Sequence, residues 1–142
     1  IRDRYPSHEA AVQILKGQEF MPINSVQMVL TRDELVGLQR KVNSLNVHES
    51  IFDYIVTLVE ATRASEYFSM GASPRGANAL LRMSRAMALL AGREYVVPDD
   101  IAAVFTVVLG HRVKLSSRAR ANGFTVEAAL EEVRKSVKLP RT

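Results

Sequence analysis

Apolar side chains recur every three or four residues through the segment 49–64, and this spacing makes it an amphipathic helix. At 3.6 residues per turn these positions share one face, which must be buried against neighbouring elements. The segment therefore predicts a fold built by packing helices together. The face consists of Ile51, Tyr54, Ile55, Leu58, Val59 and Thr62.

Five more segments carry the start and stop signals of helices. Thr31 and Glu34, for example, have the spacing of a capping box, and Pro74 suits a first helical position. We expect these helices at 8–16, 32–45, 74–91, 98–109 and after Thr125. Residues 111–123 are expected as loop, with a short extended piece at 113–115. With six helices and no convincing strand pair, the chain predicts an all-α fold, a small helical bundle preceded by one helix and an extended linker.

Residues 18–30 form the best internal boundary of the chain. Pro22, Asn24 and Ser25 are followed by an apolar run, which we interpret as an extended linker that crosses a hydrophobic surface. We therefore divide the chain into 1–17 (a strand tail and a helix), the linker 18–30, and a helical domain over 31–142.

The helix predicted at 74–91 has many small residues on its inner face, which implies close approach of a neighbouring helix. Arg82, Arg85 and Arg93 are expected on the outside. The predicted inner face is Ala77, Leu80, Leu81, Ser84, Ala88 and Ala91.

The start of this helix is the candidate site. Ser73 is expected as the N-cap, with its hydroxyl accepting a backbone N–H of the first turn. Arg75 then lies where a helix carries partial positive charge and prefers anions. Two sources of positive character at one place suit a bound phosphate. The alternative is a surface arginine on a well-capped helix.

The sequence lacks a complete active site. It contains no G-x-x-x-x-G-K-[ST] phosphate loop, no cysteine, and three histidines (His8, His48 and His111) without an i,i+4 partner. Asp99 and Asp100 are adjacent carboxylates and could form a catalytic pair. Acids that only stabilise the first turn of a helix are far commoner than catalytic pairs. No apolar run approaches the length of a membrane span, and no signal peptide is expected. A chain that begins with Ile1 is expected to be cut from a longer one.

Two alternatives to a phosphate-binding site remain. A net charge of +4 permits a nucleic-acid-binding module, or the chain is a ligand-free protein-interaction bundle with residues 26–30 and the last helix as its contact surfaces. The nucleic-acid hypothesis rests on the arginines at 82, 85, 93, 112, 118 and 120.

Two stretches together resemble the lid domain of MoxR-type AAA+ ATPases. They are Gly71-Ala72-Ser73-Pro74-Arg75 and Arg93-Glu94-Tyr95-Val96-Val97-Pro98-Asp99-Asp100-Ile101. The flanks Tyr5-Pro6-Ser7 and His111-Arg112-Val113 are also similar to the family, so the resemblance covers essentially the whole chain. Arg4, where a Gly is expected, and Val97, where a Thr cap is common, depart from the pattern.

The resemblance implies that Arg75 is the sensor-2 arginine, which reaches from the lid to the β- and γ-phosphates of ATP bound on the ATPase core. By the same analogy Ser73 lies at the ATP site, and Ala72, Ile14 and Gln18 line the adenine pocket. Residues 1–17 would be the end of the AAA+ core and 31–142 the lid.

The resemblance also implies a parent protein that hydrolyses ATP with Mg²⁺. The phosphate loop and magnesium acids would lie upstream of Ile1, so this chain alone is expected to be non-catalytic, with no cofactor bound. The implied partners are its own ATPase core, neighbouring subunits of a homo-oligomeric ring (a hexamer), and a client protein, often with a metal-dependent adhesion domain. The implied role is chaperone-like maturation of partners in the cytoplasm.

Overall fold

The computed structural model describes residues 5–17 and 26–140. Contacts between Cα atoms group the chain into two compact units, 1–35 and 36–142. The elements are α1 (His8–Leu15), α2 (Arg32–Ser44), α3 (Glu49–Ala64), β1 (Phe68–Met70), α4 (Pro74–Leu90), α5 (Pro98–Leu109), β2 (Lys114–Leu115), α6 (Ser117–Ala121) and α7 (Val126–Ser136). The predicted division at 17 and 30 remains a prediction.

The first unit contains α1, which begins and ends as its caps predict. The Ser7 hydroxyl accepts a hydrogen bond from Ala10 N at 3.2 Å, and Gly17 follows the helix with a φ of 69°. A positive φ is readily adopted by glycine and stops a helix. Of the predicted linker, 26–30 has neither helix nor strand, and its apolar side chains are exposed.

Both reciprocal hydrogen bonds of the predicted capping box are present at the start of α2. Thr31 N donates to Glu34 Oε2 at 2.7 Å, and Glu34 N donates to Thr31 Oγ1 at 3.2 Å. The hydrogen bonds from Thr31 lower the pKa of Glu34. Because α2 has no buried residue, this local hydrogen bonding, rather than packing, defines where it begins.

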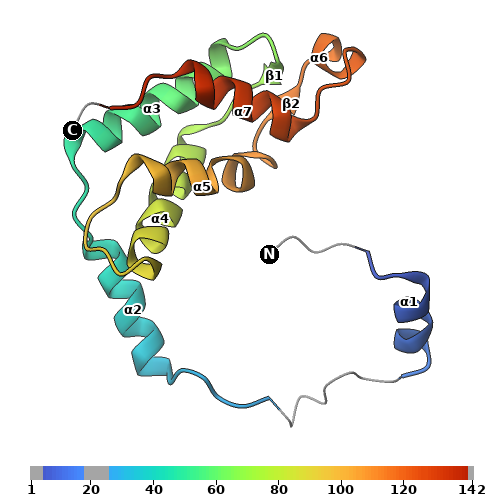
Figure 1. The fold of residues 1–142 in the computed structure, drawn as a ribbon, viewed down its shortest axis with the longest axis vertical. Helices are drawn as coiled ribbons and strands as arrows, with labels where there is room; N and C mark the ends of the chain where they lie inside the picture. The colour runs from blue at the N-terminus through green and yellow to red at the C-terminus, as the bar shows by residue number, and fades with distance from the viewer. Residues whose placement is uncertain (1–4, 18–25, 141–142) are drawn as a thin grey trace. The chain divides into compact units, whose positions relative to one another are not determined.

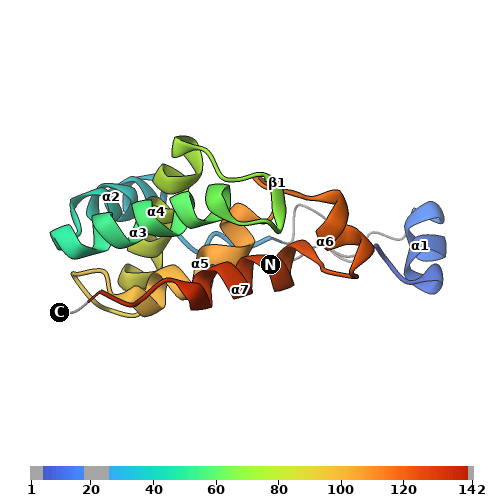
Figure 2. The ribbon, with the colours of Figure 1, turned by 90° about the horizontal axis from the view of Figure 1, so that it is seen from above.

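The bundle in 36–142 is formed by α3, α4, α5 and α7, and Figures 1 and 2 show α7 lying alongside α3. The buried residues of α3 are the six that its spacing predicts. Helix α5 contacts both α4 and α7. The largest fully buried side chains lie where these helices meet, and they include Phe105, Leu58, Leu80, Ile101, Leu109 and Leu130.

The close approach predicted for α4 occurs against α5, the element with which it packs most extensively. A Cβ on Gly76 would lie 3.2 Å from Leu109 Cδ2, so the missing side chain lets the two helices touch. Ser84 and Ala88 are also buried on this face. The prediction for Ala91 was wrong, because the helix ends at Leu90 and Ala91 is its exposed C-cap.

Two short elements, β1 and α6, were not predicted. Strand β2 lies within the extended piece predicted at 113–115. Its antiparallel pairing with β1 was not expected, because segments of three and two residues are too short to display alternation. Helix α6 lies within the predicted loop 111–123, and Ser116 caps it by accepting from Ala119 N at 3.2 Å. Its five residues include two arginines, which is why the segment was interpreted as a solvated loop. The all-α class is nevertheless confirmed, since the described chain has seven helices and this one small sheet.

Candidate functional site

Helix α4 begins at the predicted residue, but its cap differs from the prediction. Ser73 has the extended backbone of an N-cap (φ −86°, ψ 168°), yet its hydroxyl makes no capping hydrogen bond. Its carbonyl oxygen accepts from Gly76 N at 2.8 Å and Ala77 N at 3.3 Å. The N–H of Gly76 therefore has a backbone acceptor, and the predicted hydroxyl cap is absent.

Arg75 occupies the first turn with its side chain exposed. Among the residues that the structure describes, its guanidinium has no ion pair or hydrogen bond. The first turn of α4 also contains no acidic residue. A cation at this position is normally unfavourable, and here no neighbouring carboxylate compensates for it.

The turn before α4 is attached to the last turn of α3. Ala72 N donates to Thr62 Oγ1 at 2.9 Å, and Arg63 Nε donates to Ala72 O at 2.7 Å. Gly71 lies directly against this turn, because a Cβ on it would come within 2.6 Å of Arg63 Cα. The path of the chain into α4 is thus fixed by the end of α3.

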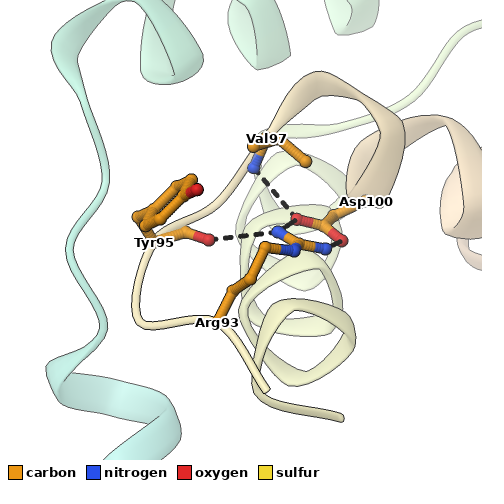
Figure 3. A network of polar contacts seen from close by, with 4 residues as sticks. All are labelled: Arg93, Tyr95, Val97 and Asp100. Atoms are coloured by element: carbon orange, nitrogen blue, oxygen red, sulfur yellow. Dashed lines mark hydrogen bonds and ion pairs between the residues drawn. The ribbon is translucent and has the colours of Figure 1, made fainter. Parts of the chain in front are cut away.

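The opposite end of α4 carries a second arginine, which the sequence analysis placed wrongly. Arg93 was expected outside, and Asp100 was interpreted as a helix-start acid. Asp100 does lie in the first turn of α5, as predicted, but Arg93 is paired with it rather than free on the outside. Figure 3 shows their two-pronged ion pair, with Arg93 Nη2 to Asp100 Oδ1 at 2.6 Å and Nη1 to Oδ2 at 2.8 Å. Arg93 Nη1 also donates to Tyr95 O at 3.2 Å.

Asp100 completes this network by capping α5. Its Oδ2 accepts from Val97 N at 2.9 Å. Burial would raise the pKa of Asp100, but the hydrogen bonds from Arg93 and Val97 and the charge of Arg93 outweigh it, so that pKa is lowered. The hydrogen bond to Asp100 likewise raises the pKa of Arg93. One signal pointed here: an acid three residues after an N-cap can accept a hydrogen bond from the backbone N–H of the N-cap residue, as in a capping box.

The remaining predicted site residues have different surroundings. Ala72 is 1% exposed, and both its backbone polar groups are bound to α3. Ile14 lies on α1 and is 60% exposed. Gln18 lies outside the described residues. Their assignment to an adenine pocket stays a prediction.

The arginines behind the nucleic-acid hypothesis do not form one unpaired set. Arg93 binds Asp100, Arg118 Nη1 lies 3.4 Å from Glu66 Oε2, and Arg112 Nε donates to Val108 O at 3.1 Å. Within 5–17 and 26–140 no three His, Asp or Glu side chains gather in a way that would hold a metal ion. In the same ranges, no helix combines the length and apolar character needed to cross a membrane.

Comparison with known proteins identifies the bundle. A family model described as the AAA lid domain matches residues 60–133, which run from the end of α3 through most of α7. The chain belongs to the AAA lid domain family. The match includes the turn at Gly71, the start of α4 and the Arg93–Asp100 pair.

Relatives of this AAA lid chain confirm the predicted resemblance to MoxR-type AAA+ ATPases. Over 99% of its length it is 37% identical to the protein YeaC of Bacillus subtilis, and over 96% it is 34% identical to Chaperone MoxR1 of Mycobacterium tuberculosis. A solved structure of a candidate ATPase from Cytophaga hutchinsonii superposes on 97% of the chain with a TM-score of 0.77 and 29% identity. The chain covers 44%, 38% and 45% of these three proteins, less than half of each.

Proposed function

We propose that Arg75 is the sensor-2 residue of this AAA+ lid and contacts the β- and γ-phosphates of ATP bound on an ATPase core. The observation that carries the proposal is the state of its side chain. Arg75 is exposed, lies in a first helical turn without acids, and has no partner among the described residues. An uncompensated cation of this kind is suited to an anionic ligand.

The backbone at the start of α4 supplies a second group with positive character beside the Arg75 guanidinium. In the described part of the chain the N–H of Arg75 has no hydrogen-bond partner, whereas Gly76 N and Ala77 N donate to the Ser73 carbonyl. Free N–H groups at a helix N-terminus and a guanidinium both favour phosphate oxygens. The unused Ser73 hydroxyl is available for the same ligand.

In this proposal triphosphate, held with Mg²⁺ on the ATPase core, draws the lid onto the core, and hydrolysis releases it. That movement would pass to neighbouring subunits of a homo-oligomeric ring, which we propose to be a hexamer, in the cytoplasm. The name of the relative Chaperone MoxR1 supports a chaperone-like role in maturing a client, which we propose carries a metal-dependent adhesion domain. Ile14, Gln18 and Ala72 are proposed as adenine contacts.

The test measures ATP turnover by a longer chain that joins this lid to its ATPase core. Arg75→Ala removes a charge-assisted contact of about 1.5–3 kcal/mol, so we expect turnover at limiting ATP to fall roughly tenfold to a hundredfold. Arg82→Ala is the matched control, since it removes an exposed arginine from the same helix and should leave turnover unchanged. Equal turnover of the Arg75→Ala and Arg82→Ala proteins would overturn the proposal.

A further inference from the structure

Both backbone polar groups of Ala72 are held by two successive residues of α3. Thr62 Oγ1 accepts from Ala72 N at 2.9 Å, and Arg63 Nε donates to Ala72 O at 2.7 Å. These bonds join positions nine and ten residues apart, across the turn that contains β1. They fix Ala72 three residues before Arg75.

The Thr62 hydroxyl is fully committed to this arrangement. Thr62 is 0% exposed, and its hydroxyl donates to Val59 O at 2.6 Å while it accepts from Ala72 N. Because the proton points along α3 to Val59, a lone pair is left facing Ala72. A valine at position 62 would keep the shape but leave the buried N–H of Ala72 unpaired.

The chain between Ala72 and Arg75 has little freedom to absorb a change at Thr62. Gly71 lies against Arg63 so closely that a Cβ would be 2.6 Å from Arg63 Cα. After Ala72 come only Ser73 and Pro74, and the proline ring holds φ near one value. Gly76 is packed on Leu109 on the other side. The direction in which Arg75 leaves the lid therefore depends on where Ala72 is held.

We propose that Thr62 is a positioning residue for Arg75, acting through Ala72. The inference rests on the proposed function, in which Arg75 binds the phosphates of ATP. Thr62 itself contacts no nucleotide, and its role is to keep the start of α4 at one place on α3. A misplacement of about 1 Å at a binding group is enough to lower turnover strongly.

The experiment measures ATP turnover at limiting ATP by the chain joined to its ATPase core, for Thr62→Val and Thr62→Ser. We expect roughly a tenfold loss for Thr62→Val and near-normal turnover for Thr62→Ser, which keeps the hydroxyl. Ser84→Ala is the matched control, because Ser84 is also 0% exposed but its hydroxyl donates only to Leu80 O within α4. Ser84→Ala should retain turnover even where its melting temperature falls as far as that of Thr62→Val.

Thr62→Val is also measured in an Arg75→Ala background. If Thr62 acts through Arg75, the second substitution causes little further loss, whereas a general structural effect lowers turnover equally in both backgrounds and overturns the inference. A loss with Arg75→Ala but none with Thr62→Val refutes only the positioning role. No loss with Arg75→Ala refutes the proposed function, and the positioning role with it.

Arg63→Met keeps the inference testable should Thr62→Val fail to fold. It removes the other hydrogen bond to Ala72 from a side chain that is exposed. Arg82→Met is its control, with the same loss of charge on α4. We expect a several-fold lower turnover for Arg63→Met than for Arg82→Met, and equal values would overturn the inference.

Discussion

The two ends of α4 each carry an arginine, and the two arginines have opposite surroundings. Arg75, in the first turn, is exposed and has no partner among the described residues. Arg93, three residues after the last turn, binds both oxygens of Asp100, whose side chain is 5% exposed. The start of α4 is held where the Thr62 and Arg63 side chains of α3 bind the backbone of Ala72. The other end is held by the ion pair between Arg93 and Asp100 of α5.

This difference separates a residue that builds the lid from one that is available to a ligand. Arg93 joins the C-terminal end of α4 to the N-terminal end of α5 through Asp100 and Tyr95. Arg75 joins nothing in the described chain, so its removal should alter function without altering the fold. Substitutions at either end of α4 test this difference.

The largest expected effect is on stability, from removal of the acid that holds Arg93. Asp100→Ala removes the two contacts with Arg93 and the cap on Val97. We expect the free energy of unfolding to fall by about 2–3 kcal/mol, because a nearly buried, charge-assisted network loses its centre. Urea denaturation of the chain measures this. Asp99→Ala, next to it and exposed, is the control, and equal losses for the two would contradict the account.

The next effect tests the backbone contacts at the start of α4. Gly71→Ala should destabilise the chain by about 1–3 kcal/mol, because its Cβ would meet Arg63 backbone atoms at 2.6–2.7 Å. Gly37→Ala is the control, since a Cβ there meets nothing within 4 Å and lies inside α2, where alanine is favoured. Thermal melting compares them. A Gly71→Ala protein as stable as Gly37→Ala would show that the turn is not pressed against α3.

A smaller effect should appear in acid. The pKa of Asp100 is lower in the fold than its ordinary value, so the carboxylate stabilises the fold above the unfolded-state pKa, about 3.9. That stabilisation is lost as the pH falls through 3.9 toward the lower folded-state pKa. Melting temperatures measured from pH 6 to pH 3 should therefore decline less for Asp100→Ala than for Asp99→Ala. Parallel declines would mean that the pair with Arg93 does not shift the titration.

The smallest expected effect is that of Arg75→Ala on the folding of the chain. The exposed side chain makes no contact that the described structure would lose, so the free energy of unfolding should change by less than about 0.5 kcal/mol. Urea denaturation under the conditions used for Asp100→Ala gives the comparison. A loss above about 1 kcal/mol would place Arg75 among the residues that hold the lid together.

Sequence alone predicted most of the fold because the long helices carry repeated signals. The three-four spacing of 49–64 and the capping box at Thr31 and Glu34 are local features, and both appear where expected. Strand β1, its pairing with β2 and helix α6 were missed because two to five residues contain too little pattern, whereas the extended piece at 113–115 was predicted. β1 and β2 also depend on a pairing between segments more than 40 residues apart.

The candidate site was only partly predictable for a different reason. The position of Arg75 in a helix start follows from Ser73 and Pro74, which are its neighbours in sequence. The Thr62 hydroxyl faces Ala72 only because α3 and α4 pack together, and nothing in the local sequence of either residue requires it. Arg93 was placed outside because its position after the end of α4 was considered without the acid on the next helix.

The most direct measurement of the division between the two arginines is the affinity of the chain joined to its ATPase core for a non-hydrolysable ATP analogue. With Arg75→Ala we predict a dissociation constant roughly tenfold to a hundredfold higher, at an unchanged melting temperature of the ligand-free protein. An unchanged dissociation constant would contradict the account, and Arg75 would then be a surface residue of the lid like Arg82.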